Sequence, residues 1–276
     1  MKNRIINSST FLLAAYFIIH FFSLGSQYII LKALNVRGVT AYFFYNNYSL
    51  PPNSWWSKTK VFLIFGIELF MVFMLLVLAL ILVTKLSRKN HKLKVFYNWI
   101  IVVCSAFIIA SILSAPFFRE ASPMFTVFLW MRFQDGGGGM YLLALLSLPF
   151  IPLVGYFIRT PFLKMTNTVK TLQSKKSRVL WIFKTAFIPF MGLVGVLALF
   201  VFDLYTYPLL SAVSNEGMRL LVIGAILFFA GVFSFKNKNF ISIERSNTSH
   251  LSNIPLTMLV LVSICAAYVL LWLNLS

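Results

Sequence analysis

Polar side chains recur along one face of the first apolar stretch of the chain, and they are the residues best placed to do chemistry. At 100° per residue, all of them fall within about 60° of one another on a helix. They are Ser9, Tyr16, His20, Ser23 and Gln27. A lipid environment cannot satisfy such a stripe, so we expect it to face other helices or a water-filled cavity.

Glu68, in the second apolar stretch, is the predicted partner of this stripe. Consecutive spans run antiparallel, and a rise of 1.5 Å per residue places Glu68 at the depth of Gln27, with His20 deeper. We expect Glu68 to hydrogen-bond Gln27 or Ser23. The candidate ligand-binding cluster is therefore His20, Ser23, Gln27 and Glu68. Two interpretations remain open: a structural polar clamp, or a site for a ligand or a proton.

The composition determines which elements must position these residues. Hydrophobic residues make up 60% of the chain and charged residues only 11%, whereas a soluble domain carries about 25% charged residues. The sequence predicts an all-α polytopic bundle of about seven transmembrane helices (six to eight), forming a single integral membrane domain over residues 1–276. The predicted spans are 10–33, 60–84, 96–115, 140–158, 180–202, 218–235 and 255–274.

The net charge of +18 would suggest nucleic acid in a soluble protein. Here most Lys and Arg residues fall in alternate short loops, which indicates orientation instead. We expect a cytoplasmic N-terminus in a bacterial inner membrane, anionic lipid headgroups as partners on the cytoplasmic face, and no nucleic acid. A protein partner or a second copy is left open. On this topology Arg219 is counted with the basic residues of the outer side, at the start of the sixth predicted span, and Glu216 lies on or near the outer side.

Four consecutive glycines, Gly136, Gly137, Gly138 and Gly139, precede the fourth span. A phosphate-binding P-loop needs a following lysine and hydroxyl residue, which this run lacks. We interpret the glycines as a hinge or tight turn. A nest of backbone N–H groups for an anion is the alternative.

Prolines interrupt two of the predicted spans, at Pro149 and Pro152 in the fourth and at Pro189 in the fifth. They are interpreted as the mid-span helix breaks of the chain. Proline removes a backbone hydrogen bond, and transporters place substrates where such broken helices meet. The prolines therefore favour transport, but weakly.

Motifs for catalysis are incomplete. Intramembrane metalloproteases carry H-E-x-x-H on a helix, whereas the segment from His20 reads HFFSL and lacks the glutamate and the second histidine. We expect no bound metal, no cofactor and no enzymatic activity. The expected function is binding or transport of a small or lipid-like solute. A membrane scaffold or accessory subunit of an envelope complex is the alternative, and a degenerate, non-catalytic relative of those proteases is a distant one.

Overall fold

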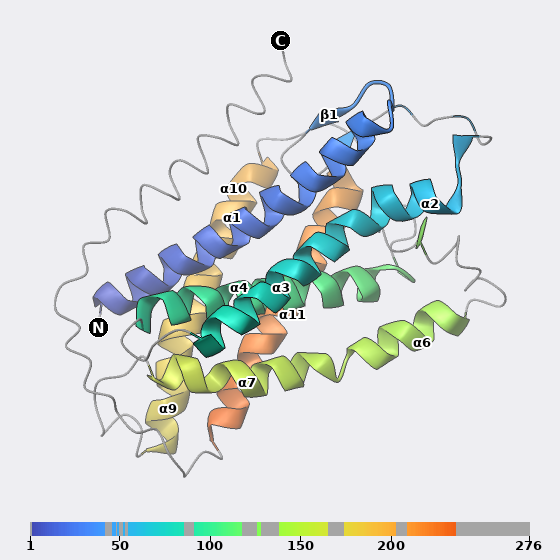
Figure 1. Cartoon of the computed structure of the whole chain (residues 1–276). Helices are drawn as coiled ribbons and strands as arrows, with labels where there is room; N and C mark the ends of the chain where they lie inside the picture. Colours follow the sequence, from blue (N-terminus) through green and yellow to red (C-terminus); the bar gives the residue numbers. More distant parts are fainter. Residues whose placement is uncertain are drawn as a thin grey trace.

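The computed structural model of the chain is an all-α bundle (Figure 1). It describes residues 2–41, 46–47, 49, 52, 55–85, 91–117, 126–127, 138–164, 174–202 and 209–235. Six helices in these ranges are long and apolar enough to cross a membrane, which confirms the predicted class. They are Ile5–Ala33, Lys58–Lys85, Leu93–Ser114, Gly138–Leu163, Lys175–Ala198 and Asn215–Ser234. The predicted seventh span, 255–274, lies outside the described residues.

Several spans consist of more than one helical segment. The elements in chain order are α1 (Lys2–Ala33), strands β1 (Thr40–Ala41) and β2 (Asn46–Asn47), α2 (Lys58–Val61), the π-helix η2 (Phe62–Gly66), α3 (Ile67–Lys85), α4 (His91–Ser114), α6 (Gly138–Ser147), α7 (Phe150–Lys164), α9 (Lys175–Ile182), the π-helix η3 (Phe183–Phe187), α10 (Ile188–Phe202) and α11 (Leu209–Ser234). Below, the end of the bundle near β1 and β2 is called the hairpin end, and the end where α1 begins is called the amino end (Figure 1).

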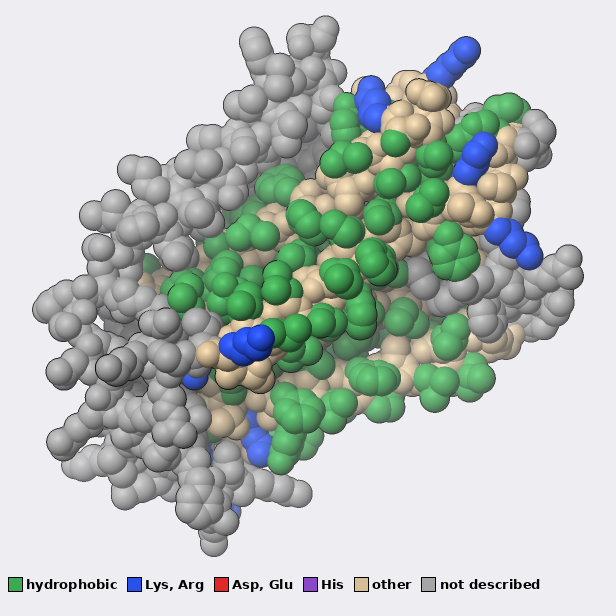
Figure 2. All heavy atoms as spheres, viewed as in Figure 1, with side chains coloured by type: hydrophobic (Ala, Val, Ile, Leu, Met, Phe, Trp, Pro, Cys, Tyr) green, Lys and Arg blue, Asp and Glu red, His purple; other side chains and the backbone are tan. Residues whose placement is uncertain are grey.

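Helix α4 lies at the centre of the bundle and contacts α1, α3, α6, α7 and α11. Trp99 and Phe107 on α4 are fully enclosed or nearly so. The outward faces are apolar as well: Phe73 on α3, Leu145 on α6 and Phe157 on α7 are all exposed. Figure 2 shows hydrophobic side chains covering these faces. A surface with this much apolar area requires lipid as its solvent.

The two π-helices both present a backbone carbonyl to α1. The side-chain nitrogen Nε2 of Gln27 donates to the carbonyl of Ile64 in η2 at 3.4 Å. The hydroxyl of Ser8 donates to the carbonyl of Thr185 in η3. In η3 the cause is visible in the sequence, because Pro189 lacks the N–H that would bond to Thr185 in an α-helix. The first span is therefore hydrogen-bonded to the second and the fifth spans at the backbone carbonyls of their irregular turns.

The helix break at Pro149 divides the fourth span into α6 and α7. Bonds three residues apart span the break, from Leu148 N to Leu145 O and from Ile151 N to Leu148 O. Pro152 lies in the first turn of α7, where a missing N–H costs little. The predicted boundary at residue 158 was wrong, since α7 continues to Lys164 and includes a further proline, Pro161.

The glycine run lies at the start of α6. Gly136 and Gly137 are outside the described residues, whereas Gly138 and Gly139 form the first turn of the helix. Among the described glycines, positive φ occurs at Gly38, in the loop after α1. A Cβ at Gly138 would meet no atom within 4 Å. The described half of the run is thus ordinary helix rather than a turn that needs glycine.

Candidate functional site

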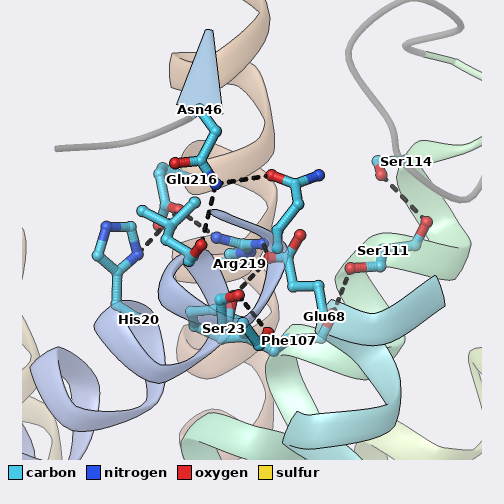
Figure 3. A network of polar contacts seen from close by, with 12 residues as sticks. His20, Ser23, Asn46, Glu68, Phe107, Ser111, Ser114, Glu216 and Arg219 are labelled. Carbon is cyan, nitrogen blue, oxygen red and sulfur yellow. Dashed lines mark hydrogen bonds and ion pairs between the residues drawn. The ribbon is translucent and has the colours of Figure 1, made fainter. Parts of the chain in front are cut away.

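Three helices bring a polar cluster together in the hairpin half of the bundle (Figure 3). Ser23 on α1, Glu68 on α3 and Arg219 on α11 each lie about ten residues from the hairpin end of their helical run, which is at Ala33, Lys58 and Leu209 respectively. Ten residues correspond to roughly 15 Å along a helix axis. Equal depth on neighbouring helices allows the three side chains to meet. All three are buried.

Arg219 links the two carboxylates of the cluster. Its Nη2 atom lies 2.8 Å from Oε1 of Glu68, and its Nη1 atom contacts Oε1 of Glu216, one turn earlier on α11. The guanidinium carbon lies 3.9 Å from the centre of the Phe107 ring on α4. Charge-assisted hydrogen bonds of this kind are stronger than neutral ones, and burial removes the water that would weaken them.

The α1 stripe supplies the remaining polar groups around these charges. The Tyr16 hydroxyl donates to Oε2 of Glu216. Nδ1 of His20 lies 3.6 Å from Oε1 of Glu216, and the His20 ring stacks on Tyr16 with centroids 5.8 Å apart. The Ser23 hydroxyl donates to Oε1 of Glu68 at 2.7 Å. Glu68 therefore receives two donors on the same oxygen.

The loop between α1 and α2 covers the cluster from the hairpin end. Asn46 on β2 is buried, and its amide nitrogen donates to Oε1 of Gln27 and to the carbonyl of Leu24, both at 2.9 Å. Figure 3 shows Asn46 entering the cluster from the strand. Leu31 and Val36 anchor the loop in a small apolar core of its own.

The structure places the four candidate residues near one another, with partners that differ in part from those expected. Ser23 bonds to Glu68, as one of the two expected contacts requires. Gln27 bonds to the carbonyl of Ile64 and to Asn46 instead of Glu68. His20 faces Glu216.

The fifth member of the predicted stripe, Ser9, does not join it. Ser9 is half-buried and donates to the carbonyl of Ile5 in its own helix. The neighbouring Ser8 is the buried residue. The partners of α1 differ along its length, since Ser8 bonds to Thr185 in η3 and Ser23 bonds to Glu68 in α3. One face of the helix is therefore not buried from end to end.

Glu216 and Arg219 are functional candidates that the sequence reasoning missed. The prediction put them before or at the very start of the sixth span, 218–235, but α11 begins at Leu209 and both side chains are buried. Their polarity masked the start of the span. Their spacing of three residues, which puts them on one helix face, was the available signal.

A second polar network lies in the amino half and consists of neutral donors. Nε1 of Trp99 donates to the Ser8 hydroxyl at 3.1 Å, and Ser8 donates to Thr185. Nε1 of Trp181 donates to the carbonyl of Phe162 at 3.1 Å. These bonds connect α1, α4, α7, α9 and η3.

Two arginines close the last turn of α11 at the same end. Arg178 is buried and donates to the carbonyls of Ser234 and Phe235 at 2.9 and 3.2 Å. Arg159 donates to the carbonyl of Phe233 at 3.3 Å. Cations at a helix C-terminus satisfy its last carbonyls and its dipole.

The hairpin-half cluster can bind protons and hydrogen-bond or charge-pair with a polar group. Within the described part of the chain, no three His, Cys, Asp or Glu side chains are arranged to hold a metal ion. No protein family, curated protein or solved structure shows significant similarity to the chain.

Proposed function

We propose that this protein is a non-enzymatic membrane protein that binds and moves a small solute at the cluster of His20, Ser23, Glu68, Glu216 and Arg219. One observation carries the proposal: two carboxylates, a guanidinium and an imidazole are enclosed together roughly 15 Å from the hairpin end of a membrane bundle. Moving an ion from water into a protein interior costs on the order of several kcal/mol. Ionisable residues inside membranes therefore mark solute or proton pathways more often than they serve packing alone.

The surrounding helices support movement as well as binding. The cluster lies beside two irregular segments, the π-helix η2 next to Glu68 and the loop that carries Asn46. Such turns contain backbone groups whose hydrogen bonds can be exchanged without unfolding a helix. The solute would reach the cluster from the hairpin end.

A membrane scaffold or accessory subunit is the second candidate. The observation that favours it is that the charges of the cluster already pair with one another across α3 and α11. A cluster of this kind can hold three helices together without any solute. Its exposed apolar faces would then contact a partner protein as well as lipid.

Native mass spectrometry of gently solubilised protein separates the two functions. Our proposal expects a small molecule or lipid retained by the wild type and lost in Glu68→Gln, a variant that removes a charge but retains a hydrogen-bonding side chain. Arg37→Gln, at an exposed position in the loop after α1, is the matched control and should retain it. A stoichiometric protein partner with no retained small molecule would instead establish the scaffold.

We further propose that the membrane is the bacterial cytoplasmic membrane, with the amino end in the cytoplasm and anionic headgroups around it. The basic residues of the amino end support this orientation, among them Lys85, Lys175 and Lys176. Reporter fusions at Asn90 and Leu172 should give cytoplasmic signals, and a fusion at Leu50 an external one. A cytoplasmic signal at Leu50 would reverse the orientation.

A further inference from the structure

The fixed charges of the hairpin-half cluster do not balance. From α3 comes Glu68, and from α11 come Glu216 and Arg219. With both carboxylates ionised and the guanidinium charged, the cluster carries one excess negative charge. Helix α4 contributes the Phe107 ring at this point and no charge. An excess charge enclosed in a bundle is unfavourable, so one further positive charge is needed.

The contacts around Glu216 indicate that this residue is an anion. Its two oxygens accept hydrogen bonds from the Tyr16 hydroxyl and the Arg219 guanidinium. The guanidinium has no acceptor atom, and a positive charge in contact with a carboxylate favours its ionised form. Glu68 also has an oxygen in contact with the guanidinium of Arg219 and with the Ser23 hydroxyl. We therefore assign the missing positive charge to a neighbouring group rather than to either carboxylate.

His20 is the titratable side chain in position to supply that charge. It is fully enclosed, and Nδ1 lies 3.6 Å from Oε1 of Glu216. Imidazole changes charge near neutral pH, whereas the phenol of Tyr16 gains no positive charge at any pH. Protonation adds one N–H bond to the ring and brings the cluster of Glu68, Glu216, Arg219 and His20 to neutrality.

We propose that the cluster is a proton-binding site in which His20 carries one exchangeable proton opposite Glu216. The proton is taken from water and returned to water. Coupling of this proton to solute movement rests on the proposed function, since a group that changes the charge of a buried site changes its affinity for a polar solute. The proton site itself does not rest on the proposed function, because it is argued from the charge balance and from the contacts of Glu216 with Arg219 and His20.

Nitrogen NMR of histidine-labelled protein in lipid nanodiscs tests the proposal. The chain contains three histidines, so His91→Gln and His250→Gln leave His20 as the single reporter. We expect the imidazolium pattern of nitrogen shifts at neutral pH. Glu68→Gln removes one negative charge, so in that background the signals should change to the neutral imidazole pattern at the same pH.

Ser8→Ala, which alters the amino-half network instead, is the control and should leave the imidazolium signals in place. A neutral His20 in the otherwise wild-type background at neutral pH would overturn the proposal, as would imidazolium signals unchanged by Glu68→Gln. Neither result depends on a bound solute. A negative NMR result would not affect the conclusion from native mass spectrometry about the solute. A negative native mass spectrometry result would not affect the conclusion from NMR about the proton site.

Discussion

Buried polar side chains connect the helices in both halves of the bundle, but the chemistry of these contacts differs between the halves. In the amino half, neutral donors such as Trp99 and Trp181 bind hydroxyl or backbone oxygens, and Arg178 satisfies the end of α11. In the hairpin half, charged side chains from α3 and α11 pair with one another. Neutral bonds to the backbone fasten helices at low cost. Arg178 is also buried, but it is a single guanidinium against backbone carbonyls, whereas the hairpin half encloses two carboxylates, a guanidinium and an imidazole together. This concentration of ionisable groups is why the hairpin half is the candidate site.

The largest effect is expected from Arg219→Gln. The substitution leaves Glu68 and Glu216 facing each other without the guanidinium that links them. Breaking a buried ion pair by removing one partner costs about 3–5 kcal/mol. We expect strongly reduced accumulation in the membrane and a lower melting temperature in detergent. The same change at exposed Arg37 should have little effect, and equal behaviour of the two variants would contradict the buried cluster.

A close helix crossing should give the next largest effect. A Cβ at Gly155 on α7 would lie 2.8 Å from the carbonyl oxygen of Ile226 and 2.8 Å from Cβ of Phe229 on α11. Gly155→Ala therefore forces the two helices apart, at a cost of about 1–3 kcal/mol. Gly192→Ala, where a Cβ would meet no atom within 4 Å, is the matched control. Thermal unfolding of both variants checks the crossing, which would be refuted by equal melting temperatures.

The amino-half network should respond mildly to Ser8→Ala. The change removes the donor to Thr185 and the acceptor of the Trp99 N–H. Hydrogen bonds between membrane helices contribute about 1 kcal/mol each. We expect a small fall in melting temperature with binding at the hairpin half retained. Ser9→Ala, which alters only a bond within α1, should be neutral.

The smallest effect is expected at the glycine run. Gly138 lies in the first turn of α6, and a methyl group there would meet no atom within 4 Å. Gly138→Ala should therefore be neutral or stabilise the protein by about 0.5–1 kcal/mol. Loss of accumulation would show that this position requires glycine after all.

Features that depend on residues close together in the sequence were predictable, whereas features that depend on packing between helices were not. Spans depend on the local run of apolar residues, so the helical bundle was predictable. Part of the site was also predictable, because Tyr16, His20 and Ser23 share one face of one helix. Glu216 and Arg219 were assigned to the outer side because charges reduce the apparent hydropathy at the start of α11.

The irregular turns were harder to predict from the sequence. Pro189 indicated a break in the fifth span, but the donor to the Thr185 carbonyl in the π-helix before it is Ser8, far away in the sequence. The π-helix η2 has no proline to signal it. Gln27 donates to the carbonyl of Ile64 in η2, and this contact could be recognised only once α1 and η2 were known to be neighbours. Partners on different helices depend on packing, which one-dimensional patterns do not determine.

A double-mutant cycle between Glu68 and Arg219 determines whether charges from α3 and α11 balance in one buried cluster. The measurement is the melting temperature of Glu68→Gln, Arg219→Gln and the double variant in the same nanodiscs. Removing Glu68 as well as Arg219 leaves Glu216 with His20, so the cluster can be neutral again. We expect the double variant to have a higher melting temperature than Arg219→Gln alone. A double variant that melts lower, with the two losses simply adding, would contradict it.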